Sequence, residues 1–244
     1  LPVDYTIGDT IALDCSDALT VSTTALPTAA VGTVYSQPLS AAGADGTYSW
    51  SISAGTLPAG ISLVGSTISG TPTSTGTSEF TVKATSGDGQ TATRPLSIEV
   101  FPELSVTTTS LPAGTVDTVY ATALTATGGD GTYSWSISAG ALPDGLTLSA
   151  DTISGTPTTT GTSTFTLQVT TGDGQTATKE LSISVVRIAA TLELSPSVLS
   201  FTALADTATL VATVKDAGGV VLEDPTVTWT SSNTTVATVS AAGL

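Results

Sequence analysis

The sequence lacks the residue types on which most enzyme chemistry depends. It has no histidine, no methionine and one cysteine, Cys15. Without histidine it loses the usual proton shuttle and the commonest metal ligand. A lone thiol cannot form an intrachain disulfide, and we expect Cys15 to be a small buried strand residue. We therefore expect no catalytic, metal-binding or cofactor-binding residues and no cofactor, and we predict that the chain is not an enzyme.

Basic residues are scarce as well. Five Lys and Arg face 20 Asp and Glu, which gives a net charge of -15 at pH 7. Such a surface repels nucleic-acid phosphates and anionic membranes, and no apolar run reaches the length of a membrane span. We therefore predict that the chain binds no nucleic acid and that this segment makes no membrane contact.

An internal repeat organises the sequence. The block TYSWSISAG contains Trp50 and recurs around Trp135, 85 residues later, and the same offset relates Phe80 to Phe165. We place repeat 1 at residues 19–103 and repeat 2 at residues 104–188. A period of this length fits one β-sandwich domain per repeat.

Apolar and polar residues alternate within each repeat. Tyr48, Trp50 and Ile52 share one parity, as do Phe165 and Leu167 in the second copy. This alternation indicates half-buried antiparallel strands, and the intervening Gly-Asp-Gly and Leu-Pro-x-Gly sequences are turn signals. We predict an all-β chain of tandem immunoglobulin-like β-sandwiches arranged as a rod, because neither repeat boundary carries a flexible linker. Trp50 and Trp135 are the expected core anchors.

The stretch LPAGISLVGSTISGTPTSTGTSEFTVKATSGDGQTAT and its second copy resemble the bacterial putative Ig repeat, a cadherin-like module of surface proteins. The resemblance implies an extracellular or cell-surface location. The family often carries an Asp where this chain has Thr85-Ser86 and Thr170-Thr171, which argues against calcium binding. We attribute the isolated acids to turn chemistry, in which Asp bonds its own backbone; they are Asp45, Asp88, Asp130 and Asp173.

The remaining segments have no repeat partner. Residues 189–244 contain VTWTSSN and VATVS and resemble a group 2 bacterial Ig-like domain, which we expect to be incomplete at its C-terminal end. Residues 1–18 form a lead segment in which Ile11, Leu13 and Cys15 alternate as in a strand. Asn233-Thr234-Thr235 is an N-glycosylation sequon. It also matches the signature of the family, which favours a structural role in a turn.

These features predict a structural spacer, stalk or fibre subunit of a prokaryotic cell surface or extracellular filament. The expected partners are proteins: other copies of the chain or other surface proteins. Copies could assemble head to tail if the lead strand of one chain completes the third domain of the next; otherwise both ends are cuts in a longer array. The rival interpretations are an adhesin-type module that binds glycan or protein through its loops, and accessory domains of a secreted enzyme. Nearly identical loops in the two repeats favour the spacer.

Overall fold

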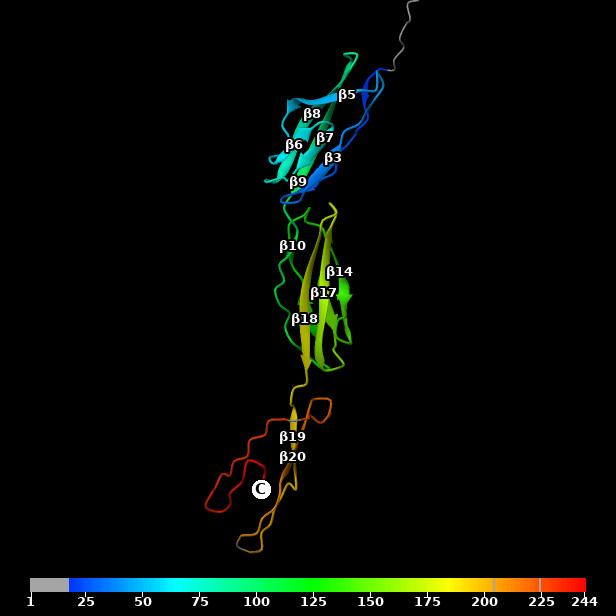
Figure 1. Ribbon diagram of the computed structural model, residues 1–244. Helices are drawn as coiled ribbons and strands as arrows, with labels where there is room; N and C mark the ends of the chain where they lie inside the picture. The colour runs from blue at the N-terminus through cyan, green and yellow to red at the C-terminus, as the bar shows by residue number, and fades with distance from the viewer. Residues whose placement is uncertain (1–17, 204, 224) are drawn as a thin grey trace, which may run out of the picture. The chain divides into compact units, whose positions relative to one another are not determined.

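The computed structural model describes residues 18–203, 205–223 and 225–244 (Figure 1). Strands, turns and irregular segments account for these ranges, and none of them contains a helix. It follows that no described helix could cross a membrane. The all-β prediction is confirmed. The strand expected around Ile11, Leu13 and Cys15 lies outside the described residues.

Repeat 1 folds as two packed β-sheets. One has the order β2-β9-β8-β5, the other has the order β3-β7-β6, and β1 pairs with β4 beside them. The strands are β1 (Thr20–Val21), β2 (Ala29–Ala30), β3 (Tyr35–Pro38), β4 (Ala41–Ala42), β5 (Tyr48–Gly55), β6 (Ile61–Val64), β7 (Thr67–Gly70), β8 (Gly76–Ser86) and β9 (Thr91–Phe101).

The long hairpin of β8 and β9 forms the centre of the larger sheet. Its antiparallel register runs from Thr85 opposite Thr91 to Gly76 opposite Val100. The short strand β2 lies on the other side of β9 and runs parallel to it, with Ala29 opposite Val100. The second and the last strands of the repeat are therefore hydrogen-bonded neighbours.

Alternation along these strands builds the core. Phe80, Val82 and Ile98 are between 0% and 3% exposed, and Ile68 of β7 is fully buried opposite them. Trp50 packs against this core but is only half-buried. It lies on β5, which is an edge strand bonded only to β8. The tryptophans therefore flank the core, and its centre is formed by phenylalanine and aliphatic residues.

Repeat 2 reproduces this architecture. Its sheets have the orders β11-β18-β17-β14 and β12-β16-β15, with β10 paired to β13. Phe165, Leu167 and Ile183 are buried at the positions equivalent to Phe80, Val82 and Ile98. The strands are β10 (Ser105–Val106), β11 (Gly114–Thr115), β12 (Tyr120–Ala123), β13 (Ala126–Thr127), β14 (Tyr133–Gly140), β15 (Leu146–Ser149), β16 (Thr152–Gly155), β17 (Gly161–Thr171) and β18 (Thr176–Val186).

One close approach in each repeat requires glycine. Gly70 has φ 146°, and a Cβ placed on it would lie 2.1 Å from the carbonyl oxygen of Gly60. Gly155 has φ 141° and the same distance to the oxygen of Gly145. Only glycine fits both the dihedral and the space, which explains the invariance of these glycines between the copies.

Residues 189–244 contain a two-stranded antiparallel ladder, β19 (Thr191–Ser195) with β20 (Val211–Lys215). Leu192 faces Val214 across it, and Val214 is buried whereas Leu192 is 56% exposed. Arg187 forms an ion pair with Asp216, just beyond the end of the ladder. The assignment of this segment to a group 2 Ig-like domain stays a prediction.

Candidate functional site

The first recurring polar feature is the turn that precedes the tryptophan strand. In repeat 1 the backbone N–H and the hydroxyl of Thr47 both donate to Asp45 Oδ1, each at 2.9 Å. In repeat 2 Thr132 donates to Asp130 Oδ1 at 2.8 and 2.6 Å. Because these bonds favour the charged carboxylate, they lower the pKa of Asp45 and of Asp130.

The second feature is the turn between the two longest strands. Ser86 Oγ donates to Asp88 Oδ1, and the backbone N–H of Gln90 donates to the same oxygen at 3.1 Å. These bonds, the serine hydroxyl first, lower the pKa of Asp88. In repeat 2 Thr171 takes the place of Ser86 and donates to Asp173.

A glutamine ties this turn to the start of the repeat. Gln90 Nε2 donates to Asp88 Oδ2 at 2.9 Å, and Gln90 Oε1 accepts from the backbone N–H of Leu19 at 3.2 Å. We call this Asp–Gln pair, Asp88 with Gln90 and Asp173 with Gln175, the turn clasp. Sequence analysis missed its role, although the identical GDGQTAT blocks, 85 residues apart, carried the signal.

The turn clasp of repeat 2 holds the chain just before that repeat as well. Gln175 Oε1 accepts from the N–H of Leu104 at 3.0 Å, and Gln175 Nε2 donates to Asp173 at 2.7 Å and to the carbonyl of Pro102 at 3.2 Å. The N–H of Gly129 donates to the same carbonyl at 2.9 Å. The backbone of residues 102–104 is thus held by several hydrogen bonds.

The acids singled out from the sequence are used as hydrogen-bond acceptors within their own turns. No cluster of three or more metal-ligating side chains occurs in the part of the chain that the structure describes. The carboxylates therefore have the local role that turn chemistry predicts. In repeat 1 the two turns lie close enough for the charge of Asp88 to oppose part of the lowering of the Asp45 pKa.

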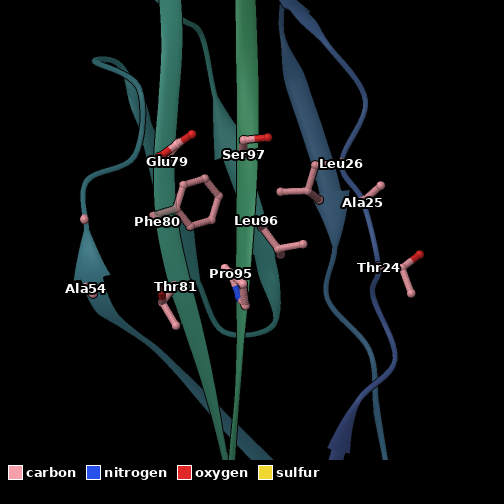
Figure 2. Close-up of a pocket in the computed structure, with 11 residues that line it drawn as sticks. Thr24, Ala25, Leu26, Ala54, Glu79, Phe80, Thr81, Pro95, Leu96 and Ser97 are labelled. Atoms are coloured by element: carbon pink, nitrogen blue, oxygen red, sulfur yellow. The ribbon is translucent and has the colours of Figure 1, made fainter.

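An edge groove lies in repeat 1 between segment 24–26 and the outer edge of the hairpin (Figure 2), with a volume of about 530 Å³. Figure 2 shows Leu26 pointing from its segment toward β9, while the ring of Phe80 points from β8 toward the same strand. Phe80 and Leu96 are 3% and 6% exposed. The groove therefore offers no open aromatic face on which a sugar ring could stack.

The same edge groove recurs in repeat 2, with a volume of about 300 Å³. Leu111 and Leu181 take the places of Leu26 and Leu96, and Glu180 takes the place of Pro95. Each groove is lined by a single carboxylate, Glu79 in repeat 1 and Glu180 in repeat 2. Most glycoside hydrolases use a pair of carboxylates at a fixed separation, and the residues that line each groove do not include such a pair.

A family profile described as "Putative Ig domain" matches residues 18–101 and 103–186. The chain belongs to the putative Ig domain family. The matched ranges coincide within two residues with the repeats deduced from the 85-residue offset. Tandem domains of this kind are typical of structural or adhesive extracellular modules, and the fold is typical of non-catalytic ones.

Solved structures similar to these putative Ig domains include tandem immunoglobulin arrays. Sidekick-1 immunoglobulin domains 1–4 are 14% identical, with 70% of this chain and 49% of that chain covered and a TM-score of 0.42. Drosophila OTK extracellular domains 3–5 are 13% identical, with 69% and 60% covered and a TM-score of 0.45. Endo-fucoidan hydrolase MfFcnA9 of glycoside hydrolase family 107 is 22% identical, with 66% and 33% covered and a TM-score of 0.33.

The chain thus spans about half the length of the first of these structures. No curated protein matches it.

Proposed function

We propose that the chain is a structural spacer, a stalk or fibre segment of a prokaryotic cell surface or extracellular filament. The proposal rests on the close similarity of the two repeats, which extends from their fold to individual hydrogen bonds. Core, turn clasp and edge groove recur at an offset of 85 residues, including hydrogen bonds such as Leu19 to Gln90 and Leu104 to Gln175. Binding specificity normally resides in loops that diverge, and the loops here have been kept alike.

The junction between the repeats supports this function. Strand β9 ends at Phe101 and β10 begins at Ser105, so three residues separate the last strand of repeat 1 from the first strand of repeat 2. Their backbone is fixed by bonds from Gly129 and Gln175 to Pro102, and from Leu104 to Gln175. A spacer holds its ends apart only if its joints resist bending. We propose that this joint is stiff and that the array is rod-like.

Small-angle scattering tests the spacer directly. We expect the wild-type chain to be extended, and a short Gly-Ser insertion between Phe101 and Pro102 to reduce the average end-to-end distance because the linker becomes a flexible coil. The Gln175→Ala variant should shift in the same direction, since it removes the side chain that holds Pro102 and Leu104. A wild-type profile indistinguishable from that of the insertion variant would exclude a spacer.

The ladder β19–β20 suggests how copies could join. Leu192 and Leu194 are 56% and 43% exposed although their cross-strand partner residues Val214 and Ala212 share that face. A strand supplied by residues 1–18 of another copy would add to an edge of this ladder by main-chain hydrogen bonds and extend its apolar face, and a head-to-tail contact of this kind propagates. We expect deletion of residues 1–18 to abolish concentration-dependent filaments in sedimentation, and filaments that survive the deletion would contradict strand donation.

A further inference from the structure

Asn233 is the only asparagine in the sequence, and it begins the triplet Asn233-Thr234-Thr235. The middle residue is not proline, as an N-glycosylation acceptor requires. All three residues are exposed and lie at a turn that follows the Trp229 segment. The motif is therefore accessible in the folded chain.

The hydrogen bonds of the triplet leave one side-chain atom of Asn233 available. Thr235 donates to Asn233 Oδ1 twice, from its backbone N–H at 3.1 Å and from its hydroxyl at 2.6 Å. Within the described residues, Asn233 Nδ2 has no hydrogen-bond partner. The structural role expected of this asparagine thus uses the side-chain oxygen Oδ1 alone.

The turn itself is braced independently of that nitrogen. The backbone N–H groups of Val236 and Ala237 donate to the carbonyl of Asn233 at 3.1 and 3.2 Å. Ser231 Oγ donates to the carbonyl of Ala237 at 2.7 Å and accepts from the N–H of Asn233 at 3.3 Å. A substituent on Nδ2 would leave all of these bonds in place.

We propose that Asn233 Nδ2 is an acceptor for an N-linked glycan. The co-substrate is an oligosaccharide linked to a lipid pyrophosphate. Nδ2 forms the new bond to the anomeric carbon, the bond from that carbon to the pyrophosphate oxygen breaks, the lipid pyrophosphate leaves, and a base of the transferase takes the amide proton. The inference rests on the extracellular placement in the proposed function, because the donor is met on export.

The test is a glycosylation reaction on the folded, purified chain. The reactants are a lipid-linked oligosaccharide and an oligosaccharyltransferase that accepts plain Asn-Xaa-Thr acceptors, with intact mass as the readout. We expect one glycan per chain, mapped to Asn233, and none on Asn233→Gln or Thr235→Ala. Thr235→Ser, which keeps the hydroxyl, should remain an acceptor. The matched control is Thr234→Ala, because Thr234 is exposed and its substitution keeps the sequon; it should react like the wild type.

A short peptide spanning residues 229–238 shows whether the transferase accepts this sequence at all. If the peptide is modified while the folded chain is not, or if Thr235→Ala reacts as well as the wild type, the proposal is wrong. Neither result touches the spacer function, because the scattering experiment does not involve Asn233. Conversely, a flexible array with a glycosylated Asn233 would retain this site and refute the spacer.

Discussion

At the scale of single residues, the phenylalanine of the central strand and the tryptophan of the edge strand differ in burial and therefore in how much their removal should destabilise the domain. Phe165 is 1% exposed in the centre of its sheet, whereas Trp135 is half-buried on the edge strand β14. We expect Phe165→Ala to lower the free energy of unfolding of repeat 2 by about 3–5 kcal/mol, the usual cost of deleting a buried aromatic. Trp135→Ala should cost less. Chemical denaturation of both variants checks this order, and an equal or larger cost at Trp135 would contradict it.

The lowered pKa of Asp130 makes stability depend on pH in the acid range. Its carboxylate accepts from the hydroxyl and the N–H of Thr132, and these bonds hold the pKa below its ordinary value. A group whose pKa is lower in the folded state stabilises the fold above the unfolded pKa of about 3.9, and this contribution is lost as pH falls through the folded value. Melting temperature should therefore fall as pH drops below about 4.

Asp130→Asn should make that fall shallower, because the amide keeps an oxygen acceptor but cannot be protonated in this range. The matched control is Glu99→Gln, which removes one exposed charge on β9 without removing a turn bond. A melting profile for Asp130→Asn as steep as that of the control would show that the turn carboxylate contributes nothing to acid stability.

At the scale of elements, two neighbouring residues of β18, Lys179 and Glu180, point their backbone N–H groups to opposite sides of the strand. The N–H of Val116 donates to the carbonyl of Val186 on the β11 side. By alternation along a strand, Glu180 also points to that side, where β11 pairs only with Val185 and Val186. Its N–H therefore lies on an open edge, whereas the N–H of Lys179 points to β17. Repeat 1 has Pro95 at the position of Glu180, as an open edge permits.

This geometry predicts different losses of stability when proline replaces Glu180 or Lys179, two adjacent exposed residues. Glu180→Pro should leave stability nearly unchanged. Lys179→Pro should destabilise repeat 2 by roughly 1–3 kcal/mol, because it leaves a carbonyl of β17 without its donor. Denaturation midpoints of the two variants measure the difference. If both substitutions are equally harmful, β18 is not open at Glu180.

The same elements show how far sequence reasoning could go. Alternation and the 85-residue offset predicted the long strands, since the period of two reports the buried face of β8 and β9 directly. They overestimated the burial of Trp50, because alternation does not reveal which strand forms the edge of a sheet. The edge groove had no sequence signal: it depends on where segment 24–26 runs between β1 and β2, and no residue pattern fixes that path.

At the scale of the whole molecule, a spacer must resist being pulled from its ends. In each repeat a short strand near the start runs parallel to the last strand and is hydrogen-bonded to it. These pairs are β2 with β9 and β11 with β18. Tension on the two ends of a repeat therefore loads these hydrogen bonds in shear, so that they must break together and cannot open one at a time. The bonds include Val31 N–H to the carbonyl of Phe101 at 3.0 Å and its equivalent from Val116 to Val186.

Single-molecule stretching should show two unfolding events of equal length, one per repeat. Each repeat of 85 residues releases roughly 280–310 Å of extended chain, less the folded length. Val31→Pro deletes the donor of the β2–β9 clamp and should lower the unfolding force of one event only. Repeat 2, with Val116 intact, is the control within the same molecule. Two events at unchanged force would show that the clamp does not bear load, and a single event of double length would show that the repeats unfold as one body.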